Sequence, residues 1–211
     1  MSLKFRRFCF FSAVVVGLAS VAAPRDGLTQ ASLRSSFPGR RVGGGTRGEC
    51  SSRVLAHLVP GNSVFAPGSG KLLGLVQGPS RQPVSLTITF KPEPGGQAIS
   101  RTLPASAAGL TLVQGSAVTA PTIWESAFDC GSGDAGSSGD PLSFVQTVSP
   151  PAVSLLLAES DPSDAAVLSA LQALRGRCGS TVPAQATLAK FGLADLMTSE
   201  WPEQLPVRCP S

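Results

Sequence analysis

Acid–base chemistry at neutral pH would depend on His57, because it is the sole histidine among the 211 residues of the chain. Histidine titrates near neutral pH and is the side chain most often used as a general base. In the run Val54–Val59, an extended backbone would turn His57 away from Ala56 and Leu58. The sequence has no G-x-S-x-G elbow to supply a serine nucleophile. We therefore expect an ordinary outward-facing histidine, with a small exported hydrolase or carbohydrate-active protein using His57 as the alternative.

The cysteines point to disulfide bonds. Of the five, Cys9 lies inside an apolar N-terminal run described below, which leaves Cys50, Cys130, Cys178 and Cys209. In an oxidising compartment four thiols can pair in three ways, and spacing alone does not choose among them. We expect Cys50–Cys130 and Cys178–Cys209, because each pair then falls inside one predicted structural region. No pair has the short Cys-x-x-Cys or histidine spacing of a zinc site, so we expect no metal.

Three acidic residues around a Gly/Ser loop, Asp129, Asp134 and Asp140, could in principle bind calcium. Their spacing fits no known calcium loop, and we expect them to be solvated loop acids. Trp124 lies beside Ile123 and near Phe128, so we expect a core anchor in preference to a sugar-stacking platform. We accordingly assign no catalytic residue to the chain.

Two glycine-rich stretches resemble phosphate-binding motifs but lack their context. Residues 43–48 formally satisfy G-x-G-x-x-G, yet an arginine-rich segment precedes them and no acidic residue stands between Glu49 and Glu93. Residues 68–71 resemble the end of a phosphate loop, but Phe65 replaces the first required glycine and Leu72 the magnesium-binding hydroxyl. We therefore expect no nucleotide cofactor.

The first residues have the signature of an export signal. Lys4, Arg6 and Arg7 precede an apolar run over residues 8–18, which is followed by small residues. The small-x-small rule favours cleavage after Ala22, and the apolar run is too short for a membrane span. We expect residues 1–22 to be a signal peptide and the product to be exported, to the periplasm or the extracellular space, with no transmembrane segment after cleavage.

Composition then divides the chain into three parts. Residues 23–49 are rich in Arg, Gly, Ser and Pro, a composition that cannot offset its ordering entropy, so we expect a disordered arm. The formal net charge of +4 falls to near +1 without the signal, and the arm is basic while the rest is mildly acidic. Exposed arginines usually keep an arm soluble, so we expect no nucleic-acid partner.

Short apolar runs broken by Gly and Pro fill residues 50–150 and predict strands. The clearest is Val84–Phe90, in which apolar and hydroxyl side chains alternate strictly, and it is expected to form a hairpin with residues 97–103. The other expected strands are residues 54–59, 71–76, 110–113, 122–128 and 142–148. Seven short strands with turn signals between them favour an antiparallel, immunoglobulin-like β-sandwich.

Helical patterns follow in residues 151–211, which we expect to be a helical appendage forming a short helical hairpin. Asp161–Asp164 is a helix-start signal, and apolar residues then recur at helical spacing as far as Arg175. A second helix is expected over Ala184–Lys190, interrupted at Gly192. The predicted fold is therefore mainly β with a C-terminal α-helical segment.

The run over residues 39–50, Gly-Arg-Arg-Val-Gly-Gly-Gly-Thr-Arg-Gly-Glu-Cys, resembles the opening motif of the family called domain of unknown function 928. This family comprises exported, mainly cyanobacterial proteins. The resemblance covers about residues 37–150, and it implies a β-rich domain followed by helices, with Cys50, Trp124 and Cys130 as framework. It implies no activity. We therefore expect a non-catalytic binding or structural module of the cell envelope, with a protein or envelope glycan as partner; nothing in the sequence sets the oligomeric state.

Overall fold

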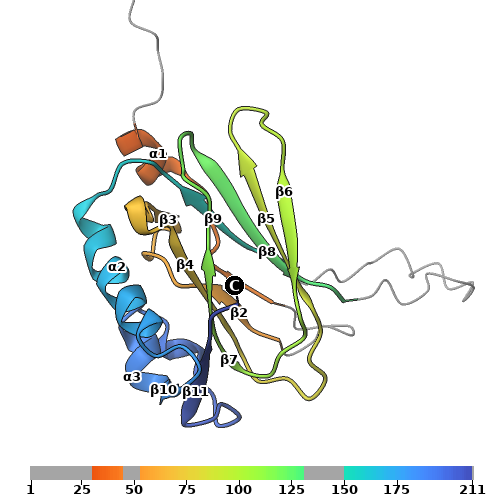
Figure 1. The fold of residues 1–211 in the computed structure, drawn as a ribbon. Helices are drawn as coiled ribbons and strands as arrows, with labels where there is room; N and C mark the ends of the chain where they lie inside the picture. Colours follow the sequence, from red (N-terminus) through yellow and green to blue (C-terminus); the bar gives the residue numbers. More distant parts are fainter. Residues whose placement is uncertain (1–29, 45–52, 131–149, 211) are drawn as a thin grey trace, which may run out of the picture.

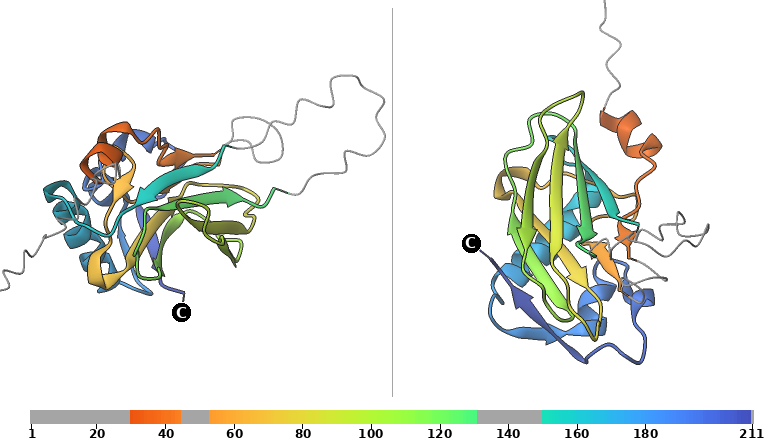
Figure 2. Two further views of the ribbon diagram at one scale, coloured as in Figure 1. Left: turned by 90° about the horizontal axis from the view of Figure 1, so that it is seen from above. Right: turned by 90° about the vertical axis from the view of Figure 1, so that its right-hand side faces the viewer.

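The computed structural model describes residues 30–44, 53–130 and 150–210, and it consists of two β-sheets stacked face to face (Figures 1 and 2). The six-stranded sheet has the strand order β1 (Val42–Gly43), β2 (Leu55–His57), β4 (Leu72–Gln77), β7 (Gly109–Gln114), β11 (Gln204–Arg208) and β10 (Thr181–Pro183). The five-stranded sheet has the order β3 (Val64–Phe65), β9 (Ala152–Leu156), β8 (Thr122–Phe128), β5 (Leu86–Pro92) and β6 (Ile99–Leu103). The helical elements are α1 (Gln30–Ser36), η1 (Gly68–Gly70), α2 (Pro162–Arg175), α3 (Ala184–Ala189) and η2 (Ala194–Leu196).

The predicted mainly β fold with C-terminal helices is confirmed. Most neighbouring strands are antiparallel, as expected, but β3 pairs with β9 and β7 pairs with β11 in parallel. Parallel neighbours need a long crossover in the chain, because a tight turn reverses the strand direction. Both parallel pairs join segments far apart in sequence, which is why no local signal pointed to them.

Strict alternation in β5 positions its side chains as predicted. Leu86 and Ile88 are fully buried between the sheets, whereas Thr87 and Thr89 lie on the other face and are partly exposed. The expected hairpin is confirmed, because β5 pairs antiparallel with β6 and Leu86 lies opposite Leu103. Because residues two apart share a face of a strand, β6 turns Ile99, Arg101 and Leu103 towards the same side.

Helix α2 covers the outer face of the six-stranded sheet (Figure 1). It begins as the sequence predicts: the Asp161 carboxylate accepts from the Ser163 N–H, and the Asp164 carboxylate accepts from the Asp161 N–H. A Cβ atom added at Gly74 of β4 would lie 2.6 Å from Leu171 Cδ2, so glycine permits the close approach of helix and sheet. This sheet is therefore covered on both faces.

Residues 30–44 depart from the expected disordered arm at 23–49. Leu33 of helix α1 and Phe37, which follows the helix, pack against a small apolar cluster that includes Leu155 of β9. Arg34 Nη2 lies 2.7 Å from the Asp164 carboxylate, whose side chain is fully buried. The Arg41 guanidinium donates to three backbone carbonyls, those of Val59, Phe191 and Gly192. Specific contacts of these two arginines, which composition does not reveal, offset the entropy of ordering the segment.

The predicted boundary between a β-sandwich at 50–150 and a helical appendage at 151–211 does not coincide with a break in the sheets. β9 is an interior strand of the five-stranded sheet, and β10 and β11 complete the six-stranded one. The expected helices are present as α2 and α3, but β10 lies between them in the chain. Residues 150–210 are therefore built into the sandwich.

Several predictions fall on residues outside the described ranges: the signal peptide at 1–22, the glycine-rich motif beyond Gly44, and the strand at 142–148. Within the described residues, no helix has the length and apolar character needed to cross a membrane.

Candidate functional site: a pocket between the two sheets

His57 is the first residue at which the structure corrects the sequence analysis. We expected it to face outward, but its exposed fraction is 0%. Strand β2 belongs to the sheet that is covered by α2 on one side and by the second sheet on the other. A side chain that points away from Leu58 therefore still enters the interior, and His57 projects between the sheets.

Two serines of the opposite sheet hold the His57 ring. Nδ1 lies 2.8 Å from Ser154 Oγ and Nε2 lies 2.8 Å from Ser126 Oγ, and both serines are fully buried. The ring stacks on Trp124 with centroids 3.5 Å apart and an interplanar angle of 9°. Burial lowers the pKa of His57 to about 3, so the imidazole is neutral at physiological pH. His57 is thus hydrogen-bonded across the space between the two sheets, and we call this group of His57, Ser126 and Ser154 the His57 pin.

In this arrangement His57 is not positioned to act as a general base on a bound substrate. His57, Ser126 and Ser154 each have an exposed fraction of 0%, and none of them lines the pocket described below. A general base must come within hydrogen-bond reach of the proton it abstracts, directly or through one water. Both ring nitrogens of His57 are already paired with the serines. The geometry therefore argues against the hydrolase alternative.

One predicted disulfide is confirmed, between Cys178 and Cys209. Cys130 is also disulfide-bonded. Cys50 lies outside the described residues, so the Cys50–Cys130 pairing stays a prediction.

Trp124 is the core anchor that the sequence predicted, with an exposed fraction of 0%. Of the three loop acids, Asp134 and Asp140 lie outside the described ranges, and the Asp129 carboxylate accepts a hydrogen bond from Thr87 Oγ1 at 2.7 Å. No group of three or more His, Cys, Asp or Glu side chains within the described ranges could hold a metal ion.

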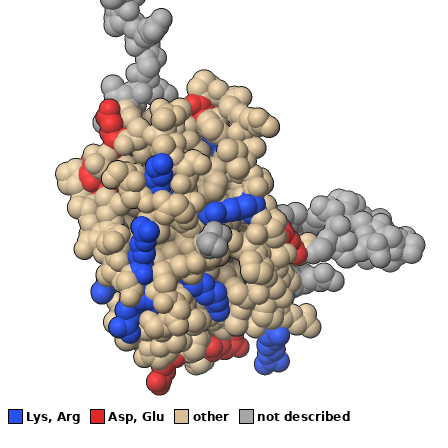
Figure 3. Space-filling model, viewed as in Figure 1, with Lys and Arg blue, Asp and Glu red and all other residues tan. Residues whose placement is uncertain are grey.

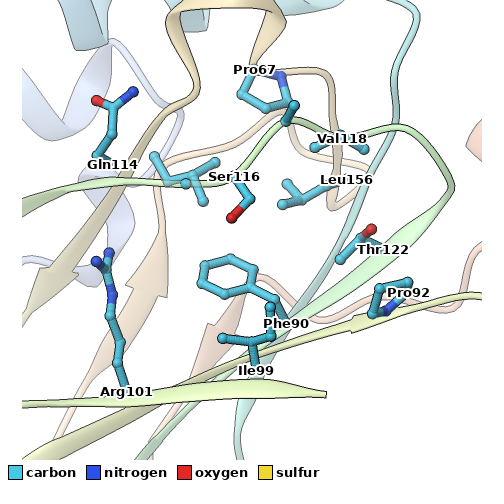
Figure 4. A pocket seen from close by; sticks show the side chains of 13 residues that line it. Pro67, Phe90, Pro92, Ile99, Arg101, Gln114, Ser116, Val118, Thr122 and Leu156 are labelled. Carbon is cyan, nitrogen blue, oxygen red and sulfur yellow. The ribbon is translucent and has the colours of Figure 1, made fainter. Parts of the chain in front are cut away.

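A pocket of about 160 Å³ opens at one end of the sandwich, between the two sheets (Figure 4). The five-stranded sheet supplies one wall through Phe90, Pro92, Ile99, Arg101, Thr122 and Leu156. The opposite wall comes from Pro67, Leu73 and Gln114 and from the loop at residues 115–118 that follows β7. An apolar cavity of about 150 Å³ accommodates a molecule the size of benzene. The pocket therefore suits one aromatic ring or one short branched alkyl group.

The pocket is continuous with the aromatic core. Phe90, in the pocket wall, is the cross-strand neighbour of Trp124, and their ring centroids are 6.3 Å apart. Trp124 in turn stacks on His57. The His57 pin therefore fixes the ring against which Phe90 rests, and an occupant of the pocket would lie one ring away from Trp124.

Polar groups are few in the pocket wall. Figure 4 shows Ser116 projecting towards the space beside Phe90, while Arg101 and Gln114 stand at one side of the pocket. No acidic side chain lines it. Nε and Nη2 of Arg101 are shielded from solvent and have no hydrogen-bond partner among the described residues. The lining thus combines mainly apolar side chains with one arginine.

Sequence reasoning missed this pocket and Arg101. One signal was available: in β6, Arg101 stands between Ile99 and Leu103 at the spacing of two that places all three on one face of the strand. An arginine between two apolar residues on one strand face indicates a cation at the edge of the apolar core. The rest of the pocket gathers residues from 67 to 156, and no spacing rule brings these together.

Basic side chains do not form one continuous patch on the face seen in Figure 3. They are scattered mainly over the lower half of the view, around α2 and α3, with uncharged surface between them and acidic groups towards the margins. This face therefore lacks the basic stripe that typifies nucleic-acid-binding proteins.

Comparison with known proteins adds no relative: no family model, no curated protein and no solved structure matches this chain.

Proposed function

We propose that the protein is an exported, non-catalytic binding module of the cell envelope, and that its pocket between the sheets receives a small apolar group. The observation that carries this proposal is the preformed pocket of about 160 Å³, with mainly apolar walls contributed by both sheets. Preformed apolar pockets with a few polar groups are typical ligand sites. Membership of the domain of unknown function 928 family stays part of the proposal and rests on the motif at residues 39–50.

Two further observations support it. The Cys178–Cys209 bond is of the kind that persists in oxidising compartments, which favours an exported protein. The side chain with the best acid–base potential, His57, is committed to the buried pin and does not face the pocket. Binding is therefore favoured over hydrolysis.

The test is binding of a neutral apolar probe to the full chain. Toluene should shift the backbone amide resonances of pocket residues such as Leu73, Phe90 and Val118, and should change the fluorescence of Trp124 in a Trp201→Phe background. Trp201 packs beside Gly78, at the end of β4 remote from Leu73, so its removal leaves the pocket intact.

A matched pair of variants locates the effect. Ser116→Phe should fill the pocket and abolish the toluene response, because Ser116 projects into it. Thr119→Phe lies on the same loop outside the lining and should bind as the wild type does. Absence of any toluene response in the wild-type chain, or an equal response in both variants, would refute the proposal.

A further inference from the structure

Strand β6 is an open edge of the five-stranded sheet. It stands last in the strand order, and among the described residues it pairs only with β5 (Figure 1). The other edge strand of this sheet, β3, is buried at both of its positions. An open edge presents backbone N–H and C=O groups without partners, and it can accept a further strand.

The ladder between β5 and β8 shows which backbone groups face which way. The Asp129 N–H donates to the Ser85 carbonyl, and the Glu93 N–H donates to the Pro121 carbonyl. Both bonds continue the register of β5 with β8. Successive residues of an antiparallel strand direct their N–H and C=O groups to alternate sides. The odd-numbered residues of β5 therefore bond to β8, and the even-numbered ones face β6.

The same alternation identifies the free groups of β6. Its odd-numbered residues lie opposite the even-numbered residues of β5 and bond to them. The N–H and C=O groups of Ser100 and Thr102 therefore point to the open edge. Their hydroxyls lie on the outer face of the sheet, where they pair with those of Thr89 and Thr87. Two residues at this spacing are what an added antiparallel strand needs for its hydrogen bonds.

The pocket adjoins this edge. Ile99 of β6 lines the pocket beside Phe90 (Figure 4), and at 61% exposure it is the one large apolar side chain that is exposed within the described ranges. Residues directly opposite on neighbouring strands share a face, with their Cβ atoms about 5 Å apart. A residue opposite Ile99 on an added strand would therefore project on the pocket side and cover Ile99.

Pairing of β6 with β6 of a second copy is disfavoured. In a two-fold antiparallel pair, the register that matches all of residues 99–103 with their copies places Arg101 directly opposite Arg101. Like charges at directly opposite positions are destabilising. An inward-facing charge is also one of the features that protect sheet edges from self-association. The chain that fits this edge is therefore one of different sequence.

We propose that β6 and the pocket bind an extended peptide segment of another protein, which adds to β6 as an antiparallel strand and places one apolar side chain in the pocket. This inference rests on the proposed function, because it assigns the ligand class of the same pocket. Backbone hydrogen bonds to Ser100 and Thr102 supply affinity, and the pocket selects the apolar side chain. The neighbouring peptide side chains face outward and are polar.

The probe is the peptide acetyl-Thr-Ser-Thr-Phe-Thr-Ser-Thr-amide, added to the full chain carrying Trp201→Phe. Calorimetry measures its affinity, and amide hydrogen exchange at Ser100 and Thr102 should slow when it binds. A peptide with Ala in place of Phe should bind about 10- to 100-fold more weakly, because it leaves the pocket unfilled. A peptide N-methylated at the two threonines beside Phe should bind at least about tenfold more weakly, because these N–H groups would face β6.

A matched pair of protein variants tests the edge itself. Thr102→Pro removes the outward N–H without removing a bond to β5, a position at which an edge strand tolerates proline. Thr102→Val is the reference, since both variants lose the hydroxyl contact with Thr87 but valine keeps the N–H. The probe peptide should bind Thr102→Pro at least about tenfold more weakly than Thr102→Val. Toluene should bind both equally, because Thr102 does not line the pocket.

The outcomes separate this inference from the proposed function. If toluene binds but the probe peptide does not, the peptide assignment is overturned while the pocket stands. Equal affinity for the N-methylated and unmodified peptides would also overturn it, and this comparison needs only the Trp201→Phe chain. Sedimentation that shows a dimer with slow exchange at Ser100 and Thr102 would assign the edge to a second copy instead. If toluene does not bind, the proposed function itself fails.

Discussion

The buried His57 should make the stability of the protein depend on pH between pH 4 and 7. Burial lowers the pKa of His57 to about 3 in the folded state, against the usual 6.5 that applies to the unfolded chain. Between these values the unfolded state binds a proton that the folded state excludes. Stability therefore rises with pH through this window and is lost as the pH falls from 6.5 towards 3.

The magnitude follows from the two pKa values. Each pKa unit corresponds to about 1.4 kcal/mol, so lowering the pH from 7 to 4 should cost about 3 kcal/mol of the free energy of unfolding. A variant without the imidazole isolates this effect, because His57 is the sole histidine. We choose His57→Gln, whose amide can pair with Ser126 or Ser154 and does not titrate.

The assay is urea denaturation of the wild type and of His57→Gln at several pH values between 4 and 7. The difference between the two unfolding free energies should change by about 3 kcal/mol across this range, with the wild type losing stability at low pH. The other titrating groups contribute equally to the pH dependence of both proteins, so their contributions cancel in the difference. Hydrogen bonds from Ser163 lower the pKa of Asp161, for example, but this group is present in both proteins.

A flat difference between pH 7 and 4 would refute the reasoning, because it would mean that the folded state accepts the proton. If His57→Gln does not fold, NMR spectroscopy of the wild-type protein alone can test whether His57 takes up a proton in the folded state. The Cε1–H resonance of His57 should keep a constant chemical shift from pH 8 to pH 4 as long as the protein is folded, whereas a titration near pH 6.5 would show an accessible ring.

Arg34→Met should lower the free energy of unfolding by about 3 kcal/mol and expose α1 to limited proteolysis, because it leaves the buried Asp164 carboxylate without its cation. Arg40→Met, at an exposed position, is the control, and equal stability of the two variants would contradict this account. Replacing both Cys178 and Cys209 by Ala should cost about 4 kcal/mol in urea denaturation, because the bond spans 31 residues and restricts the unfolded chain. A loss below about 1 kcal/mol would mean that β10 and β11 hold this region without it.

The sequence correctly predicted those strands and helices whose signals lie within a few neighbouring residues. The run at residues 122–128 was expected as a strand and forms β8, Thr122–Phe128. Helix α2 follows the expected start signal, because Asp161 and Asp164 form its capping interactions within four residues. The expected β5–β6 hairpin is also local, since a single turn joins its strands.

Elements that depend on distant partners were not predictable in the same way. β3 and β11 are short, and each pairs in parallel with a strand about 90 residues or more away in the chain. The prediction that His57 faces outward was wrong for a related reason. The alternation of side chains along a strand predicts an exposed side chain only when one face of the sheet is in contact with solvent. β2 is buried at every position, and its sheet packs against helix α2 on one face and against the second sheet on the other. The pocket likewise needs both sheets in place, and only the spacing of Arg101 in β6 hinted at it.

The parallel pairing of β7 with β11 has a consequence for the order in which the molecule is completed during synthesis. Val207 lies opposite Leu110, and β10 joins the sheet only through β11. While the ribosome has yet to produce residues 204–208, one edge of β7 therefore lacks its partner, and such an open edge readily pairs with other chains. The nascent polypeptide cannot close its larger sheet early, and it keeps one edge of β7 open until β11 has been made.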